Sequence, residues 1–257
     1  MAINVTVAGA AGAYIEGVDL ARLTQDEAAE LRTALGEYGV LFFRHQSISP
    51  EQHIECAQHF GNININRFFQ PLGDYPQIAQ VLKEPDHKKN IGEHWHTDHS
   101  YDQLPALGSI LVARELPQSG GDTIFSSMFA AYDALSDSMK QRLDGLTAVH
   151  SSRHAFGKQA YDKKDRQDFT GRLGNADAAT QDAVHPVIIK HPISGKKAVY
   201  VNPDFTLHIN GLPGSESETL LAEIYAHCGN ERFTHRFVWE DGSVACLLYT
   251  SPSPRDS

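Results

Sequence analysis

The sequence predicts one β-rich domain with helices packed around it. Short apolar stretches typical of strands are mixed with a few helices, and they lack the regular strand–helix alternation of a parallel sheet. No internal repeat and no linker divides the 257 residues, which suffice to bury a substantial core. A hydrophobic content of 41% and a charged content of 21% are ordinary for a globular protein.

The first elements are defined by the signals at their ends. Thr24, followed by acidic residues, predicts the N-cap of a helix over residues 20–39 with an apolar stripe along it. The apolar residues 40–43 predict a short buried strand. Pro50, at a first helical position, predicts a second helix over residues 49–61.

Beyond residue 61, long loops separate the remaining elements. Residues 61–93 are irregular and polar, as in loops that carry binding groups, and residues 154–182 have the character of an insertion or a lid. The other expected elements are strands at 109–113 and 122–125, a helix at 128–146, strands at 184–191 and 197–201, and a helix at 215–227.

The composition restricts the class of partner. A formal net charge of −10 argues against non-specific binding to nucleic acid or to an anionic membrane surface. No apolar run approaches the length of a membrane-spanning helix, and no basic residue precedes Arg22, as one would in a secretory signal. The three cysteines, Cys56, Cys228 and Cys246, are too few for a disulfide framework. We therefore expect a cytoplasmic protein without nucleic-acid or membrane partners, and homo-oligomerisation stays open.

The most informative stretch is Trp-His-Thr-Asp-His-Ser-Tyr-Asp, at residues 95–102. It places His96 and Asp98 two residues apart, and on a strand two such side chains point to the same face. An imidazole and a carboxylate are two parts of the 2-His-1-carboxylate triad that holds non-haem Fe(II). Alone, the pair is weak evidence, because a surface pair that caps a turn has the same spacing.

Further motifs follow the pair in a fixed order. They are Gly-Gly-Asp-Thr at residues 120–123, His-Pro pairs at residues 185–186 and 191–192, and Tyr-Val-Asn at residues 200–202. The whole set resembles the taurine and 2,4-D dioxygenase family of Fe(II)/2-oxoglutarate-dependent oxygenases, over about residues 10–245. The resemblance implies a mainly β fold, the double-stranded β-helix or jelly roll, which holds iron at one open end.

The resemblance also implies roles at the centre of the site. His96 and Asp98 would be two ligands of Fe(II), and Thr123 would contact a carboxylate of 2-oxoglutarate through its hydroxyl. With O2 as co-substrate, the implied reaction hydroxylates a small organic substrate and yields succinate and CO2. His94 and His99 are expected to be neighbours of the metal and not ligands, since His99 alternates away from the predicted ligand face.

The substrate is less well defined. The family implies sulfonates, aryloxy acids or related metabolites. Taurine itself is disfavoured, because residues 61–67 lack the histidine of taurine-specific members and Gly92 replaces their asparagine. The candidates for substrate contact are Asn64, Asn66, Arg67 and Tyr101. A structural role is expected for His185 and His191, which begin the two His-Pro pairs at strand boundaries.

The C-terminal residues depart from the family pattern. Family members continue into Trp-Asp-Asn-Arg, then a histidine that is the third iron ligand, then an arginine that pairs with 2-oxoglutarate. Residues 246–257 instead resemble a translated sequencing adapter, and no histidine follows His235. We therefore expect a single oxygenase domain at 1–245 that lacks its final strands, a non-native tail at 246–257, and a chain that is inactive as written.

Two other functions stay open at this stage. If the short C-terminus is genuine, the chain would be a catalytically dead jelly-roll protein that binds a metabolite. A zinc hydrolase could also use His96 and Asp98, although no His-Glu-x-x-His motif supplies its general base.

Overall fold

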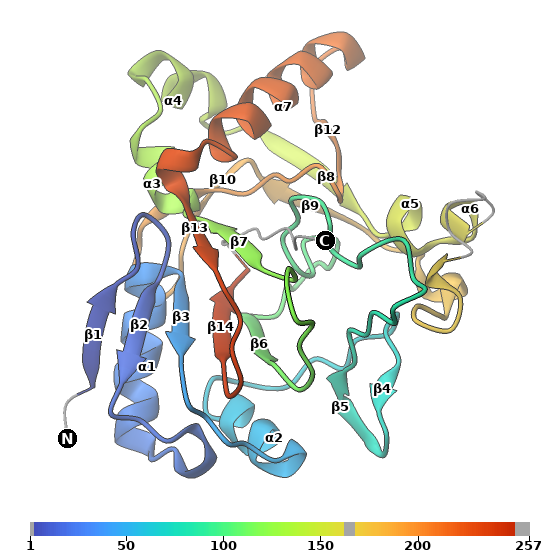
Figure 1. Ribbon diagram of the computed structural model, residues 1–257. Helices are drawn as coiled ribbons and strands as arrows, with labels where there is room; N and C mark the ends of the chain where they lie inside the picture. The colour runs from blue at the N-terminus through green and yellow to red at the C-terminus, as the bar shows by residue number, and fades with distance from the viewer. Residues whose placement is uncertain (1–2, 162–167, 250–257) are drawn as a thin grey trace.

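A five-stranded sheet lies at the centre of the fold. The computed structural model describes residues 3–161 and 168–249, and Figure 1 shows the arrangement of their helices and strands. The strand order is β1-β2-β3-β14-β6, in which β2 and β3 run parallel and the other neighbours antiparallel. These strands are β1 (Asn4–Val7), β2 (Ala13–Glu16), β3 (Val40–Phe43), β6 (Gly108–Val112) and β14 (Val244–Leu248).

Strand β14 is buried along its whole length, because it lies between β3 and β6. Ala245 pairs with Phe42 on one side and with Leu111 on the other. Residues 246–248, which the sequence prediction assigns to a non-native tail, thus continue a central strand. Their position does not reveal their origin, so that assignment stays a prediction.

The first two helices are capped where the sequence predicts. Thr24 and Ser49 each accept a hydrogen bond from the backbone N–H three residues ahead, and each forms a capping box. These caps start α1 (Gln25–Tyr38) and α2 (Pro50–Gln58). Because Thr24 begins α1, residues 20–22 form a separate 3-10 turn, η1, and not the first turn of the predicted helix.

The other strands form small sheets around this centre. Within the described residues, β8 (Thr147–Ser151) lies between β9 (Asp182–Pro186) and β12 (Thr206–Ile209). The two-stranded sheets pair β7 (Thr123–Ser126) with β13 (Thr234–Phe237), β10 (Ile188–Lys190) with β11 (Lys197–Val199), and β4 (Pro71–Leu72) with β5 (Tyr75–Ala79). Most of these pairs are antiparallel and join segments far apart in the chain, as the predicted β-rich class requires.

The helix predicted over residues 128–146 is divided in the structure. It consists of α3 (Met128–Asp133) and α4 (Asp137–Leu143). The division occurs because the hydroxyl of Ser136 accepts a hydrogen bond from the N–H of Met139 and caps a new helix.

The strand predicted over residues 184–191 is also divided, into β9 and β10. Between them the N–H of Val187 donates to the backbone oxygen of Leu146, outside the ladder that joins β8 and β9. The helix predicted over 215–227 is confirmed as α7 (Gly214–Cys228). The predicted insertion contains α5 (Arg153–Phe156), α6 (Lys158–Tyr161) and η3 (Ala176–Ala178), and its residues 162–167 lie outside the described residues.

The main core lies between the central sheet and the helices. Leu31 and Leu35 of α1 pack with Leu41 and Phe43 of β3 in the largest apolar cluster, and Leu220 of α7 belongs to the same cluster. Burial of these side chains stabilises the frame that carries the loops of the site. Among the described residues, no helix is both long enough and apolar enough to cross a membrane.

Candidate metal and substrate site

The predicted metal pair lies in a loop and not on a strand. Residues 80–107 contain no helix or strand, and His96 and Asp98 lie within them. The expectation that strand alternation turns both side chains to one face is therefore wrong. The loop nevertheless brings the two groups together, since Nε2 of His96 lies 3.7 Å from Oδ1 of Asp98.

A backbone contact fixes the imidazole of His96. Its Nδ1 lies 2.8 Å from the backbone oxygen of His94. Because a carbonyl oxygen only accepts, Nδ1 carries a proton and donates it to this oxygen. Nε2 is the nitrogen that faces Asp98. The loop thus orients the ring so that Nε2 is the nitrogen available to a metal.

Gly92 supplies the space that this imidazole occupies. Its backbone φ is +78°, and a Cβ added there would lie 2.9 Å from Cε1 of His96. A side chain at residue 92 would therefore displace the ring.

Asp98 is oriented by a strand of the central sheet. The hydroxyl of Ser109, on β6, donates a hydrogen bond of 2.7 Å to Oδ2 of Asp98. This contact leaves Oδ1 on the side of His96. A ligand oxygen held by a second hydrogen-bonding residue is the usual arrangement of a metal-binding carboxylate.

The two groups fit Fe(II) as part of its ligand set. An imidazole nitrogen and a carboxylate oxygen are the ligand types of the non-haem iron triad. Within residues 3–161 and 168–249, however, no group of three His, Cys, Asp or Glu side chains could hold a metal ion. The structure therefore assembles the two predicted ligands, and the described ranges contain no third.

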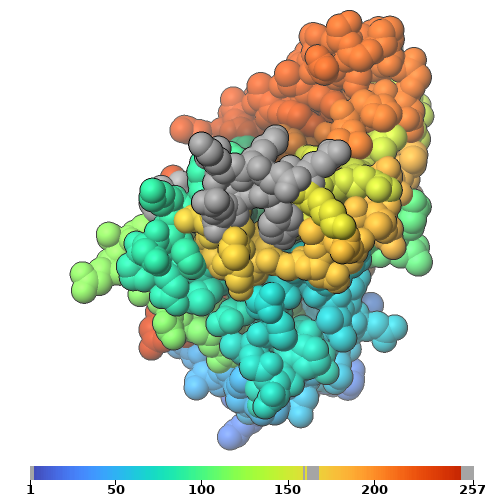
Figure 2. Space-filling model, turned by 90° about the vertical axis from the view of Figure 1, so that its right-hand side faces the viewer, coloured from blue at the N-terminus to red at the C-terminus, as the bar shows by residue number. Residues whose placement is uncertain are grey.

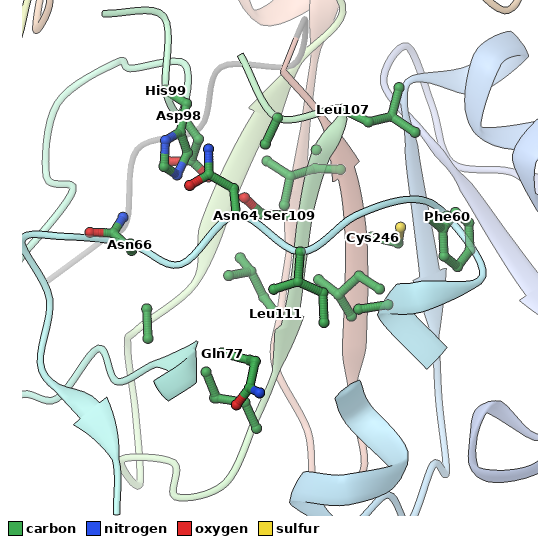
Figure 3. Close-up of a pocket in the computed structure, with 18 of the residues that line it drawn as sticks. Phe60, Asn64, Asn66, Gln77, Asp98, His99, Leu107, Ser109, Leu111 and Cys246 are labelled. Atoms are coloured by element: carbon green, nitrogen blue, oxygen red, sulfur yellow. The ribbon is translucent and has the colours of Figure 1, made fainter. Parts of the chain in front are cut away.

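A cavity of about 250 Å³ adjoins the metal pair (Figure 3). Two of the four predicted substrate residues, Asn64 and Asn66, line it, and the amide of Asn64 is directed toward Asp98 and His99. Much of the wall is apolar, with contributions from Phe60, Ile63, Phe69, Ile78, Leu107 and Leu111. The cavity suits an organic molecule whose polar end lies beside the metal pair.

Arg67 and Tyr101, the other two predicted substrate residues, do not line this cavity. Arg67 forms an ion pair with Asp102, in which Nη2 lies 2.5 Å from Oδ1. Tyr101 is 2% exposed and packs among aromatic rings, where burial raises the pKa of its hydroxyl. The two side chains contact each other and the ring of Phe68.

Comparison with known families gives these features a context. The Taurine catabolism dioxygenase TauD, TfdA family matches residues 5–247. The chain belongs to this family.

Individual members are similar over most of the chain. It is 32% identical to the alpha-ketoglutarate-dependent 2,4-dichlorophenoxyacetate dioxygenase of Cupriavidus pinatubonensis, covering 92% of this chain and 87% of that protein. The alpha-ketoglutarate-dependent sulfonate dioxygenase of Saccharomyces cerevisiae is 30% identical, and the match covers 83% of this chain and 52% of that protein. The chain spans 60% of the length of a Schizosaccharomyces pombe relative to which it is 31% identical.

Solved structures confirm the predicted jelly-roll class. The structure of a taurine dioxygenase from Burkholderia xenovorans matches with a TM-score of 0.79 and 31% identity. The match covers 100% of this chain and 84% of that one. The sheets described above are therefore those of a TauD/TfdA jelly roll.

Thr123, the residue matched to the 2-oxoglutarate threonine of the TauD/TfdA family, begins β7 and is 1% exposed. Its Oγ1 accepts a hydrogen bond of 3.0 Å from Nε1 of Trp239. Because the indole occupies an acceptor position, the hydroxyl proton is available for donation to another oxygen. Thr123 does not line the cavity beside the metal pair, so its predicted role stays a prediction.

The remaining predicted histidines make different contacts. His99 lines the same cavity as the metal pair, so the strand alternation that was expected to turn it away is wrong, while its role as a neighbour and not a ligand stays a prediction. His94 is exposed. Nε2 of His185 lies 2.9 Å from the backbone oxygen of Asp102. His191 is buried and accepts backbone N–H groups of its own turn, residues 193–194, through Nδ1.

Sequence reasoning missed Ser109 and Asp102. Ser109 was interpreted as the first residue of a strand, and nothing local indicates its contact with Asp98. Asp102 stands in the same eight-residue stretch as the metal pair, so the motif could have indicated it. Its partner Arg67 lies 35 residues earlier, which explains why the ion pair was not foreseen.

Proposed function

We propose that this chain carries the site of an Fe(II)/2-oxoglutarate-dependent dioxygenase that hydroxylates a small organic substrate, and we still expect the chain as written to be inactive. The observation that carries the proposal is the geometry of His96 and Asp98. Nε2 of His96 and Oδ1 of Asp98, whose carboxylate accepts a hydrogen bond from Ser109, lie 3.7 Å apart at the edge of a cavity with a largely apolar wall. The family of the chain and the names of its relatives support the same reaction class.

The proposed reaction assigns a role to each residue of the site. His96 and Asp98 would hold Fe(II), and Thr123 would donate its hydroxyl proton to a carboxylate of 2-oxoglutarate. When bound, the iron and 2-oxoglutarate supply oxidising chemistry that uses O2 and yields succinate and CO2. Ser109 keeps Asp98 oriented, and the apolar cavity wall excludes water from the reacting end of the substrate.

The substrate class follows from the cavity and from the relatives. We propose a sulfonate or aryloxy acid larger than taurine. The cavity of about 250 Å³ is larger than taurine requires, and its wall is largely apolar. Gly92, close against His96, leaves no room for the asparagine that taurine-specific members carry there.

A reducing compartment suits the cysteines. Cys56, Cys228 and Cys246 are all buried and free, and burial raises the pKa of the Cys56 thiol to about 11. Buried thiols with a raised pKa are poorly reactive, as expected of structural cysteines. We therefore propose the cytoplasm as the location, in keeping with the sequence prediction.

Metal binding and turnover provide the test. The full chain is titrated with Mn(II) as a redox-inert probe, and then assayed with Fe(II), ascorbate and 2-oxoglutarate for succinate, with phenoxyacetate and ethanesulfonate as substrates. Loss of Mn(II) binding in His96→Ala and in Asp98→Ala supports the ligand assignment. Substrate-stimulated succinate would refute the expectation that the chain is inactive as written. Equal Mn(II) binding by both variants and the unaltered chain would refute the proposed site.

A binding protein without turnover is the alternative function. Its motivation is that only two of the metal-binding groups occur together within the described ranges. Binding of 2-oxoglutarate or phenoxyacetate in a calorimeter, without succinate formation, would favour this alternative.

A further inference from the structure

Asp102 joins two loops of the site. We call residues 94–102, which hold the metal pair, the metal loop, and residues 61–69, which carry the two cavity asparagines, the asparagine loop. The carboxylate of Asp102 is nearly buried and has a partner on each oxygen. Nη2 of Arg67 lies 2.5 Å from Oδ1, and Nδ1 of His99 lies 2.9 Å from Oδ2. The backbone oxygen of the same residue lies 2.9 Å from Nε2 of His185. Three separate segments of the chain therefore meet at one residue.

On the metal side, Asp102 controls His99. This residue follows the ligand Asp98 directly and has a backbone φ of 59°, a left-handed conformation that is uncommon for a histidine. Its ring lines the cavity, while its Nδ1 is held by Asp102. Without that contact, the strained backbone would be free to relax and carry the His99 ring to a new position, while the hydroxyl of Ser109 would still hold Asp98.

On the substrate side, Arg67 controls the loop of residues 61–69. Its guanidinium lies 5.0 Å from the ring centre of Phe68 and 5.5 Å from that of Tyr101. The preceding residue, Asn66, lines the cavity and accepts the N–H groups of residues 68 and 69 through Oδ1. A shift of Arg67 would therefore move Asn66 and the wall that it forms.

An apolar group adjoins this ion pair and fastens the insertion to it. We call it the aromatic cluster, and it consists of Phe68, Tyr101, Phe156, Leu173 and Phe205. The rings of Phe68 and Phe156 stack with centres 4.4 Å apart, and the N–H of Gly174 donates to the backbone oxygen of Phe68. Figure 2 shows this face of the molecule, where the gold insertion lies against the cyan and teal loops. The insertion thus packs behind the cavity loop.

Electrostatics favour a charged Asp102. Burial alone would raise the pKa of this carboxyl, but hydrogen bonds from His99 and Arg67 together with the charge of Arg67 hold it below its ordinary value. A group that is charged, paired on both oxygens and mostly shielded from water has a fixed geometry. Exposed ion pairs, which are free to move, lack this property.

We propose that Asp102 and Arg67 are positioning residues that set the distance between the metal loop and the asparagine loop, and thereby determine which substrates fit. This inference rests on the proposed function for its specificity part. Neither side chain needs to touch the substrate. Each acts through a neighbour that lines the cavity, His99 in one case and Asn66 in the other.

The test uses matched variants of the full chain. Asp102→Asn keeps the side-chain shape and removes the charge, and Arg67→Lys keeps the charge and removes the planar guanidinium. Glu216→Gln is the control, because Glu216 forms an exposed ion pair with Arg142 on the surface and does not line the cavity. Melting temperatures of all variants confirm that they fold.

Hydrogen exchange measured by mass spectrometry reports how readily the backbone amides of the two loops open to solvent. In Asp102→Asn we expect exchange of residues 61–69 and 94–102 to accelerate about tenfold, with a smaller increase in Arg67→Lys and none in Glu216→Gln. Equal exchange in Asp102→Asn and in the control would overturn the proposal. This readout needs no substrate, so it decides the positioning role even if the proposed function fails.

Ligand selectivity then reports the functional consequence. Binding of phenoxyacetate and of 2,4-dichlorophenoxyacetate is measured by calorimetry with Mn(II) and 2-oxoglutarate present. We expect the ratio of the two affinities to change by about threefold or more in Asp102→Asn, with the Mn(II) affinity altered by less than about twofold. A uniform loss for both probes would show a merely structural role and overturn the specificity claim. Failure of the unaltered chain to bind either probe would instead count against the proposed function.

Discussion

Replacing Gly92 by alanine tests whether the position of the His96 ring determines metal affinity. The added Cβ would lie 2.9 Å from Cε1, whereas ordinary contacts begin at 3.4 Å, so the ring must retreat by about 0.5 Å. Metal–ligand distances tolerate about 0.2 Å, which the displacement exceeds. We expect Gly92→Ala to weaken Mn(II) binding by about 10- to 100-fold, the usual effect of disturbing the surroundings of a ligand.

Backbone strain must be separated from this steric effect. Gly92 has a φ of +78°, so any side chain there also costs about 1 kcal/mol or more of folding stability. Gly211 is the matched control, with a φ of +80° and no atom within 4 Å of the added Cβ. Electron paramagnetic resonance of free Mn(II) gives the affinities, and thermal unfolding gives the stabilities. Similar loss of stability in both variants, with unchanged metal affinity in Gly92→Ala, would refute the steric argument.

Three shorter predictions concern other contacts of the fold. Ser109→Ala removes the donor to Asp98 and should lower Mn(II) affinity about tenfold in the same resonance assay, while a loss below twofold would contradict the orienting role. Trp239→Phe removes the donor to Thr123 and should weaken 2-oxoglutarate binding about threefold by calorimetry, and an unchanged affinity would count against that site. Burial, with a contribution from a neighbouring histidine, lowers the pKa of His150 to about 3. Between pH 6.5 and 3 the folded state therefore binds fewer protons than the unfolded state, and the protein loses stability as the pH falls through this range. The free energy of unfolding in urea should therefore fall by up to about 1.4 kcal/mol per pH unit in that range. His150→Gln should flatten this slope, and an unchanged slope in the variant would show that the buried ring of His150 is not its source.

The helices could be predicted because their signals are local. Thr24 and Ser49 announce α1 and α2 within a few residues, and the capping boxes form as expected. Ser136 carries the same kind of signal, but the continuous apolar spacing on both sides hid the break between α3 and α4. Where two local signals compete, the cap determines the helix boundary, since it satisfies backbone groups that packing cannot.

The strands were harder to predict because their partners are distant. All residues of β1 are exposed, and the strand pairs only with β2 within the described sheet, so the polar–apolar alternation of its sequence does not mark a face that packs on the core. In β14, by contrast, every residue is buried, and its apolar run does not reveal a face. The sequence prediction interpreted part of that run as foreign because of the residues that follow it.

At the site, the proximity of His96 and Asp98 was predictable, and the reason for it was not. The types and order of the motifs identified His96 and Asp98, and the structure brings them together. The predicted reason, strand alternation, was wrong. The pair lies in a loop, where Ser109 holds Asp98 and a backbone oxygen holds the ring of His96. Arg67 was predicted to bind the substrate, since an arginine in a polar loop gives no sign of a carboxylate 35 residues away.

The two anchors of the metal loop make separable contributions, and this separation can be argued from their contacts. Ser109 reaches the ligand Asp98 itself, whereas Asp102 reaches His99, which lines the cavity beside it. Ser109 also lines the cavity, but its hydroxyl is engaged by Asp98, so removing the hydroxyl should mainly lower metal affinity, whereas removing the charge of Asp102 should mainly alter the selectivity between substrates. Residues without a shared partner act additively, so the double variant should show the sum of both losses. Strong coupling in the double variant would mean instead that the loop moves as one body, in which case metal binding and substrate selection in this protein depend on a single conformation.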